Sequence, residues 1–341
     1  MRVKFGVFFI LLCALWIYNP FKRFHKSQCS SSHCKVRGNI DLNATLGFEK
    51  IFAINLPSRS DRRDALQVMA ATTDIKLEFS RAVRGEQVEE VALVFGRSTN
   101  EPSIGSRGSW RSHLNVIRSV VEHRLSTTLI LEDDVDWDVR LREQMSYFWS
   151  NFGQDWMHDW DVLWLGHLGE TFDPADPGLI TFHDPTLSRS LADFYLKSTT
   201  HLPPQTRGVH PSNFPLGTFA YAVSYHGAQK ILYQIGLNST VAQYDNALAL
   251  SCQTVLNCIS VTPGLFHDYK QAGKAEKQST SSPHREEDTL QEMFSENMGM
   301  SVRRYIRGEL GKKNRYPKRP LSETEIVMRW SEAVEGRRFS T

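Results

Sequence analysis

The chain has 341 residues, of which 40% are hydrophobic and 23% are charged. These proportions are typical of a folded globular protein and exclude a chain that is disordered along its whole length. The 40 Lys and Arg residues nearly balance the 38 Asp and Glu residues, which leaves a formal charge of +2. A net charge this small creates no overall electrostatic field that would attract nucleic acid. We therefore expect no nucleic-acid partner, and we expect the function to depend on local sites.

The N-terminal region contains an apolar run, residues 5–18, with basic residues on both sides. The run is shorter than the roughly 20 residues of a typical membrane-spanning helix, so it fits either a cleaved signal peptide or an uncleaved signal anchor. Because no small-residue A-x-A sequence follows the run, we expect residues 1–20 to be a signal anchor that attaches the protein to a membrane. Residues 21–48 are rich in Ser, Asn, Lys and Gly, which predicts a stem.

Cysteines and sequons bear on the cellular compartment. Four of the five cysteines form two pairs close in sequence, Cys29 with Cys34 and Cys252 with Cys258. They fit two short disulfides in an oxidising compartment or, alternatively, four reduced thiols. Two N-x-[ST] sequons, at Asn43 and Asn238, favour the secretory pathway. We therefore expect a single-pass type II protein of the Golgi or endoplasmic reticulum membrane, with its catalytic domain in the lumen.

A catalytic domain is predicted over residues 49–270, where short apolar runs alternate with amphipathic segments. Alternation of strands and helices indicates an α/β domain with a mostly parallel sheet flanked by helices. Residues 169–215 show no clear periodicity and fit either an acceptor-site loop or a passive surface excursion. Strands are expected near residues 51–54, 77–83, 127–131, 161–165, 219–224 and 258–261, and helices near 60–69, 109–122, 227–235 and 245–250.

Residues 271–341 have a different composition from the domain before them. They begin with a Ser-, Lys- and Gln-rich stretch that predicts a flexible segment. Two amphipathic helices are expected beyond it, around residues 290–294 and 326–333, with a basic stretch between them. Such a tail is either a solvated, partly docked segment or a surface that attracts anionic head groups or a partner.

Three adjacent carboxylates, Glu132, Asp133 and Asp134, follow the strand expected at residues 127–131. Like charges so close repel one another unless a cation offsets them. In open α/β sheets, ligands bind beyond the carboxyl ends of the strands, where this triplet falls. Mn²⁺ or Mg²⁺ suits carboxylate ligands and would neutralise the charge that develops on a departing nucleoside diphosphate. The alternative is an acidic turn that caps the next helix.

Several further motifs occur in a fixed order around the triplet. They are Ile54-Asn55-Leu56 with Arg59, Asp61 and Arg62; Gly105-x-x-Gly108-x-x-x-Ser112-His113; Ile130 to Asp134; Gly217 to Ser224 with Gly227-Ala228; and Tyr244-Asp245-Asn246. Over residues 50–270 this series resembles glycosyltransferase family 25, which includes bacterial lipooligosaccharide galactosyltransferases and animal procollagen galactosyltransferases. The resemblance implies a GT-A fold and the inverting transfer of a hexose from a nucleotide-sugar, commonly UDP-galactose, to a glycan or protein hydroxyl.

The resemblance also assigns residues to the donor site. By position, it implies that a loop after the first strand lines the nucleotide end of the site, where Arg side chains can meet phosphate or ribose oxygens. For this loop the alternative is an exposed, helix-capping charge cluster, and for His113 it is packing. The residues expected to bind the donor are Asn55, Arg59, Asp61, Arg62, Ser112, His113, Glu132 and Asp133.

An inverting transfer needs a general base that takes the proton of the acceptor hydroxyl. Asp245 is the candidate, because it opens a helix after a turn and matches an acidic position of the family. Its alternative is an ordinary N-cap. Glu132 and Asp134 are expected to hold the metal, and the resemblance to GT-A enzymes suggests His267 as a third ligand, unless it is a surface histidine.

Three positions depart from the family pattern. Ser58 precedes Arg59 where an Arg pair is usual, Arg84 stands where the family has an acid, and Ser109 follows Gly108 where a Cys is usual. These departures leave open a lumenal carbohydrate-binding or assembly protein that keeps the fold without turnover. The intact acidic triplet and Asp245 favour an enzyme. A third class, a cytosolic metal-dependent hydrolase, would be excluded by occupied sequons.

Overall fold

The computed structural model describes residues 40–93, 102–152, 159–168, 170, 172–187, 202–203, 205–237, 243–270, 273–274, 290–291, 294–295, 298 and 300–308. All of them belong to one unit of the chain, residues 37–341. The predicted signal anchor, most of the predicted stem and the predicted helix around residues 326–333 lie outside the described residues. Within the described ranges, no helix combines the length and the apolar character needed to cross a membrane.

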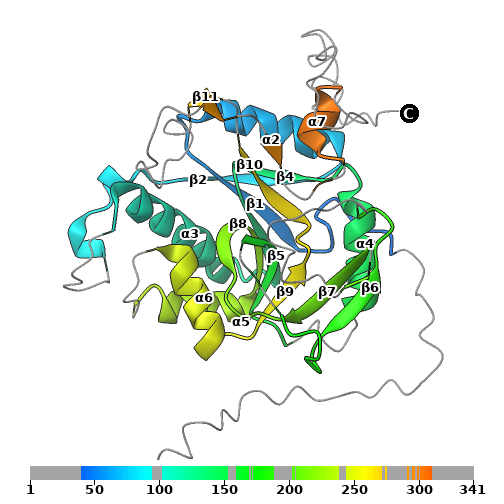
Figure 1. Ribbon diagram of the computed structural model, residues 1–341. Coiled ribbons are helices and arrows are strands. Elements are labelled where there is room, and N and C mark those ends of the chain that lie inside the picture. Colours follow the sequence, from blue (N-terminus) through cyan, green and yellow to red (C-terminus); the bar gives the residue numbers. More distant parts are fainter. Residues whose placement is uncertain are drawn as a thin grey trace, which may run out of the picture. The chain divides into compact units, whose positions relative to one another are not determined.

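An eight-stranded sheet forms the centre of the domain, with strand order β2-β1-β3-β8-β5-β9-β7-β6 (Figure 1). β1 runs parallel to β2 and β3, and β5 runs parallel to β9. β8 lies antiparallel between β3 and β5, and β7 is antiparallel to both β6 and β9. The strands are β1 (Lys50–Asn55), β2 (Glu78–Arg81), β3 (Thr127–Glu132), β5 (Val162–Leu168), β6 (Ile180–His183), β7 (Thr206–Pro211), β8 (Leu216–Ser224) and β9 (Cys258–Thr262).

Helices cover both faces of this sheet. They are α2 (Ser60–Thr72), α3 (Ile104–Glu122), α4 (Leu141–Phe152), α5 (Tyr225–Gln234) and α6 (Tyr244–Thr254), with the short 3₁₀ helices η1 (Gly85–Gln87) and η2 (Glu90–Ala92). One hydrophobic core contains side chains of α3, α5 and α6, and the other contains side chains of α2 and α4. Along β3, Leu129 and Leu131 point into the α2–α4 core, whereas Ile130 points into the other. This alternation follows from the two-residue period of a strand, and it confirms the α/β fold with a helix-flanked sheet.

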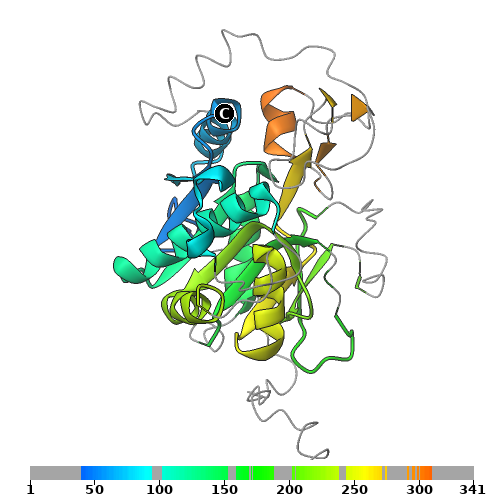
Figure 2. The same cartoon turned by 90° about the vertical axis from the view of Figure 1, so that its left-hand side faces the viewer.

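A smaller sheet brings the C-terminal part of the domain back to the acidic triplet. It has the order β13-β10-β4, with β4 (Val135–Trp137), β10 (Phe266–Lys270) and β13 (Phe294–Ser295). β4 starts directly after Asp134 and pairs antiparallel with β10. The short helix α7 (Val302–Ile306) contacts both α2 and β4, and Figure 2 shows it beyond the end of β10. Segments far apart in sequence therefore meet where β3 ends.

Two sequence-based expectations about elements need correction. Residues 169–215, expected to lack regular structure, contain the antiparallel pair β6–β7 at the sheet edge. Residues 207–210 of β7 are buried on both faces, so their sequence lacks the alternation that signals a strand. The helix expected around residues 290–294 is wrong, because β12 (Leu290–Gln291) pairs with β11 (Gly273–Lys274) and β13 pairs with β10.

Candidate active site

A cavity of about 840 Å³ lies beyond the carboxyl ends of β1 and β3. Its wall is formed by the loop after β1, the start of α2, residues 82–86, the first turns of α3, the acidic triplet, the start of β8, and parts of α6, β10 and α7. This is the position where open α/β sheets bind ligands, because loops from neighbouring strands converge there. None of the described residues between 170 and 215 lines this cavity.

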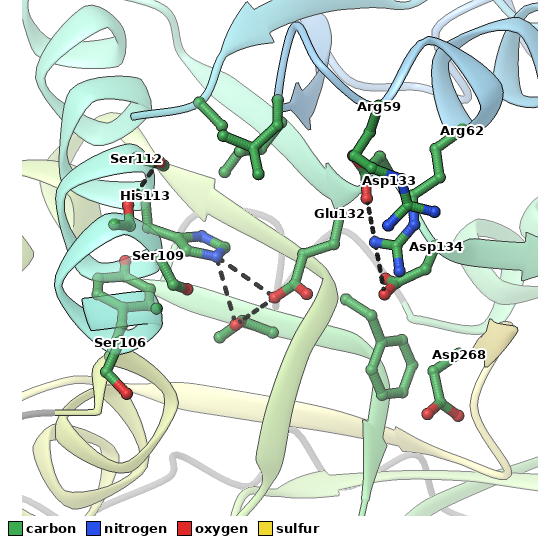
Figure 3. A pocket seen from close by; sticks show the side chains of 18 of the residues that line it. Arg59, Arg62, Ser106, Ser109, Ser112, His113, Glu132, Asp133, Asp134 and Asp268 are labelled. Carbon is green, nitrogen blue, oxygen red and sulfur yellow. Dashed lines mark hydrogen bonds and ion pairs between the residues drawn. The ribbon is translucent and has the colours of Figure 1, made fainter. Parts of the chain in front are cut away.

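Glu132, the first residue of the triplet, points toward α3 and β8 (Figure 3). Its Oε1 atom accepts a 2.6 Å hydrogen bond from the Thr218 hydroxyl and lies 3.3 Å from His113 Nε2. Burial by itself would raise the pKa of Glu132, but the hydrogen bond and charge of His113, with Thr218 and Arg62, outweigh burial and lower that pKa. Glu132 is therefore held as a carboxylate at the cavity wall.

His113 contacts Glu132 from the buried side of the cavity wall. Its ring stacks on Tyr244 with 4.6 Å between ring centroids, and its Nδ1 atom lies 3.0 Å from the Tyr221 hydroxyl. The Tyr221 and Tyr244 hydroxyls are 3.1 Å apart, and burial raises the pKa of both phenols. His113 is only 1% exposed, yet it belongs to the cavity wall. It thus packs in the core and positions a carboxylate at the same time.

Both carboxylate oxygens of Asp133, the middle residue of the triplet, interact with other side chains of the protein. Its Oδ2 atom accepts a 2.8 Å hydrogen bond from Asn55 Nδ2, and its Oδ1 atom lies 2.6 Å from Arg62 Nη1. The same Arg62 atom is 3.0 Å from Asp134 Oδ2. Asn55 also donates to the carbonyl of Arg59 and does not itself line the cavity. The repulsion expected within the triplet is therefore offset in part by Arg62.

The other charged pair of the first loop is Arg59 with Asp61, and both side chains line the cavity. Arg59 donates from Nε and Nη2 to the two oxygens of Asp61, at 2.9 and 2.7 Å. The hydrogen bond from Arg59 is the largest influence on Asp61 and lowers its pKa. Arg59 is the N-cap residue of α2, but its side chain makes no capping hydrogen bond. The alternative that this charge cluster caps α2 therefore lacks the side-chain hydrogen bond to a free amide of the helix that defines a cap.

Close backbone packing shapes the wall between α3 and residues 82–86. A Cβ atom on Gly85 would lie 1.7 Å from the carbonyl oxygen of Ile104, and one on Gly108 would lie 2.7 Å from that of Val83. Only glycine permits such an approach. Ser112, which is 2% exposed, accepts a hydrogen bond from the Val83 amide and donates to the Gly108 carbonyl. Its side chain is consequently used in holding the two segments together.

Asp245 lies at the cavity wall, where a base for the acceptor is expected. It is the second residue of α6, whose N-cap is Gln243, so the ordinary N-cap alternative does not describe its position. Its Oδ1 atom accepts from the Asn246 amide at 2.8 Å, and its Oδ2 atom accepts a longer 3.3 Å bond from the Gly217 amide. These two amides fix the carboxylate between α6 and β8.

The structure does not bring His267 into the cavity. His267 is 8% exposed, its Nε2 atom lies 3.1 Å from the Gly264 carbonyl, and burial, followed by the charge of Arg207, lowers its pKa to about 3. The next residue, Asp268, does line the cavity, because successive side chains of a strand point to opposite sides (Figure 3). Asp268 is not among the site residues predicted from the sequence, although the alternation of side chains within residues 266–270 is a signal that could have identified it.

The described residues contain no group of three or more His, Cys, Asp or Glu side chains arranged to hold a metal ion. Within the triplet, Glu132 and Asp133 point to different protein partners (Figure 3). Asp134 keeps 30% of its side chain exposed and shares the cavity with Asp268. Asp134 and Asp268, which lie far apart in sequence, are therefore two of the cavity's carboxylates that could contribute to a metal site.

A mixed α/β domain with this sheet, and with an acidic cavity at its strand ends, is that of a GT-A-like glycosyltransferase. The sequence profile described as "Glycosyltransferase family 25 (LPS biosynthesis protein)" matches residues 48–247. The chain therefore belongs to glycosyltransferase family 25.

Similar proteins are found in animals. Procollagen galactosyltransferase 1 of Danio rerio is 24% identical over 198 residues, which are 55% of this chain and 29% of that protein. Procollagen galactosyltransferase 2 of Homo sapiens is 23% identical over 198 residues, 55% of this chain and 28% of that protein. "Inactive glycosyltransferase 25 family member 3" of Homo sapiens is 25% identical over 154 residues, 40% and 25% of the two chains. The matches thus span less than a third of these relatives.

Proposed function

We propose that this protein is a metal-dependent glycosyltransferase that moves a hexose, with galactose from UDP-galactose as the first candidate, to a glycan or protein hydroxyl with inversion. The observation that carries the proposal is one cavity at the carboxyl ends of β1 and β3. That cavity collects Arg59 from the first loop, Arg62 from α2, Asp134 and Asp268 from the β4–β10 region, and Asp245 from α6. These are cations for a diphosphate, oxygen ligands for a metal and a carboxylate for proton transfer.

The donor set of the cavity fits Mn²⁺ or Mg²⁺ that binds together with the nucleotide. Mg²⁺ in particular is commonly held by one or two protein carboxylates while substrate phosphates supply further oxygens. We assign that role to Asp134 and Asp268, which both line the cavity, although Arg62 Nη1 lies 3.0 Å from one oxygen of Asp134. Asp133 accepts from Asn55 and pairs with Arg62 through its two oxygens. A bound metal would supply positive charge to the departing diphosphate.

The chain's own residues have separate tasks in this mechanism. Arg59 and Arg62 offer guanidinium groups to the nucleotide end of the donor. Asp245, fixed by the amides of Asn246 and Gly217, takes the proton of the acceptor hydroxyl while its oxygen attacks the anomeric carbon. Glu132 remains ionised beside His113 and Thr218, where it can accept hydrogen bonds from sugar hydroxyls.

The test is UDP release by the purified full-length protein from a panel of nucleotide-sugars, with Mn²⁺, with Mg²⁺ and with a chelator. We expect release from one donor, dependent on metal and increased by an acceptor. If no common nucleotide-sugar gives UDP under any of these conditions, the enzyme proposal is wrong.

A second candidate is a catalytically inactive, carbohydrate-binding or assembly protein with the same fold. It is favoured by similarity to a relative whose name describes it as inactive, and by the exposed Arg84 in the cavity wall. This candidate predicts that a nucleotide-sugar raises the melting temperature of the protein while no UDP is released.

We further propose that the domain lies in the lumen of the Golgi or endoplasmic reticulum, behind an N-terminal membrane anchor. Support comes from the disulfide between Cys252 and Cys258, which joins the end of α6 to the start of β9. Asn43 is exposed, as a glycosylated asparagine must be, whereas Asn238 lies outside the described residues. N-glycosidase treatment of the cellular protein should increase its gel mobility, and an Asn43→Gln, Asn238→Gln variant should show no such shift. Unchanged mobility of the wild-type protein would remove the support that the sequons provide.

A further inference from the structure

Part of the cavity wall comes from a segment that the family match does not reach. The match ends at residue 247, whereas α7 spans Val302–Ile306. Arg303 lies in α7 and Arg307 is its C-cap residue, and both line the cavity that contains Asp134 and Asp268. Because the two arginines are four residues apart, they project from the same side of this helical turn.

Tyr269 and the backbone of β4 hold the two guanidinium groups in place. The Arg303 guanidinium carbon lies 4.3 Å from the centroid of the Tyr269 ring, and that of Arg307 lies 5.8 Å away. Arg303 Nη2 donates to the Val135 carbonyl at 3.0 Å, and Arg307 Nη2 donates to the Tyr269 hydroxyl at 3.1 Å. The arginines are therefore oriented before any ligand binds.

Both guanidinium groups retain donors without acceptors. Arg303 Nε and Arg307 Nη1 are buried atoms that make no hydrogen bond within the described part of the chain. Arg303 is 8% exposed, and burial lowers its pKa. Neither arginine forms an ion pair with a described carboxylate, in contrast to Arg62, which pairs with Asp133. Buried donors without partners are costly, so an incoming anion that satisfied them would bind favourably.

We propose that Arg303 and Arg307 form an oxyanion subsite that binds the diphosphate of the nucleotide-sugar donor, an inference that rests on the proposed function. Planar guanidinium groups suit phosphate oxygens, which accept two parallel hydrogen bonds from one Arg side chain. The subsite shares a cavity with Asp134 and Asp268, whose negative charges would otherwise repel a diphosphate. Two cations beside two carboxylates allow both a phosphate and a metal to bind there.

The subsite also contributes to the transfer step. The bond between the anomeric carbon and the diphosphate oxygen breaks, and its electron pair stays on that oxygen. The acceptor oxygen forms the new bond to the anomeric carbon, while its proton moves to Asp245. Negative charge therefore grows on the leaving diphosphate, and donors already oriented toward it by Tyr269 stabilise that charge.

Isothermal titration of the full-length protein with UDP, uridine and inorganic pyrophosphate, each with Mg²⁺, tests the subsite. Arg307→Gln is the main variant, because Arg307 is only half-buried and glutamine can still donate to Tyr269. Arg304→Gln is the matched control, since Arg304 lies in the same helix but does not line the cavity. We expect Arg307→Gln to weaken UDP and pyrophosphate binding by about 10-fold or more and to leave uridine binding unchanged. Arg304→Gln should bind all three like the wild-type protein.

The outcomes separate this inference from the function on which it rests. If the wild-type protein binds UDP and pyrophosphate, and both Arg307→Gln and Arg303→Lys bind them within twofold of wild type, the subsite is wrong. If the wild-type protein binds neither compound, the proposed function fails together with the subsite. Pyrophosphate binding that Arg307→Gln abolishes, without UDP binding by the wild-type protein, supports the subsite and rejects only UDP as the nucleotide.

Discussion

The Nη1 atom of Arg62 lies 2.6 Å from Oδ1 of Asp133, and this ion pair joins α2 to the end of β3. Only 15% of the Arg62 side chain and 10% of the Asp133 side chain are exposed. Asn55 donates to the other oxygen of Asp133, so β1 is tied to the same carboxylate. The middle residue of the triplet thus stabilises the junction of three elements, and its neighbours Glu132 and Asp134 are left to face the cavity.

Replacing Arg62 by Met should destabilise the protein, because it leaves the Asp133 carboxylate buried without its cation. Removing one partner of a buried ion pair costs about 3 kcal/mol or more of unfolding free energy. The measurement is urea denaturation of Arg62→Met. The control is Arg118→Met, whose side chain is 58% exposed in a surface pair with Glu122, and which should stay close to wild type. Equal losses for the two variants would contradict a structural role for the Arg62 pair.

The sequence was sufficient to predict the elements that carry the triplet. A buried apolar run ending in charged residues predicts β3 and its ligand-binding end, and the ordered motifs around it predict the family. Residues of the first loop and α3 that were expected to bind the donor do meet Asp245 of α6, the expected base, at one cavity. Asn55 does not line that cavity and contacts Asp133 instead. Local patterns carry this information because each motif sits at the end of one element.

Long-range pairing could not be predicted in the same way. The register of β10 against β4 sets His267 opposite Asp136, and Asp268, not His267, lines the cavity. Nothing in the local sequence states which strand β10 joins. Likewise, Arg303 and Arg307 reach the site because α7 packs on β4 and α2, which lie far away in sequence. The spacing of these two arginines in the sequence fits a solvated basic helix equally well.

The alternation of His267 and Asp268 yields a test of the metal site. Asp134→Asn and Asp268→Asn should each abolish the extra thermal stabilisation that Mn²⁺ gives in the presence of UDP, because each removes a carboxylate from the cavity. His267→Gln should retain that stabilisation, since the His267 ring contacts the Gly264 carbonyl instead. Asp64→Asn, on the exposed side of α2, is the charge-matched control. If Asp268→Asn kept the Mn²⁺-dependent stabilisation and His267→Gln lost it, His267 and not Asp268 would be the metal ligand.

Asp245→Asn should lower kcat by about 10²- to 10⁴-fold and leave KM for the donor nearly unchanged, because the amide cannot take the proton of the acceptor. The substitution keeps the size of the side chain and one oxygen, which can accept from one of the two amides, whereas Asp245 accepts from Asn246 and Gly217 with different oxygens. Initial rates at varied donor and acceptor concentrations separate the two constants. The comparison variant is Glu132→Gln, which should mainly weaken donor binding. A large fall in kcat for Glu132→Gln, with little change for Asp245→Asn, would identify Glu132 as the base.

Glu170 links the edge of the domain to the cavity and makes stability depend on pH. Its side chain is 0% exposed and accepts hydrogen bonds from the Asn213 and Phe214 amides, at 2.6 and 3.2 Å. These residues lead into β8, whose Gly217 and Thr218 line the cavity. Burial raises the pKa of Glu170 to about 7. The folded protein therefore keeps a proton between pH 4.5 and 7 that the unfolded chain has lost, so unfolding free energy falls as pH rises through this window.

Glu170→Gln has no proton to lose, and its one side-chain oxygen can accept from only one of the two amides, because Glu170 accepts from each with a different oxygen. The loss of that hydrogen bond lowers the stability of the variant at every pH. The difference in unfolding free energy between wild type and Glu170→Gln should still change by about 3 kcal/mol across that window, in the direction that disfavours the wild-type protein at high pH. Urea denaturation at several pH values between 4.5 and 8 measures this difference. Burial lowers the pKa of His210 to about 4, which contributes a trend of opposite sign, and the Nδ1 atom of His210 lies 4.0 Å from Glu170 Oε1. Glu122→Gln, at an exposed position, should run parallel to wild type. Parallel curves for Glu170→Gln would mean that Glu170 titrates alike in the folded and unfolded chains.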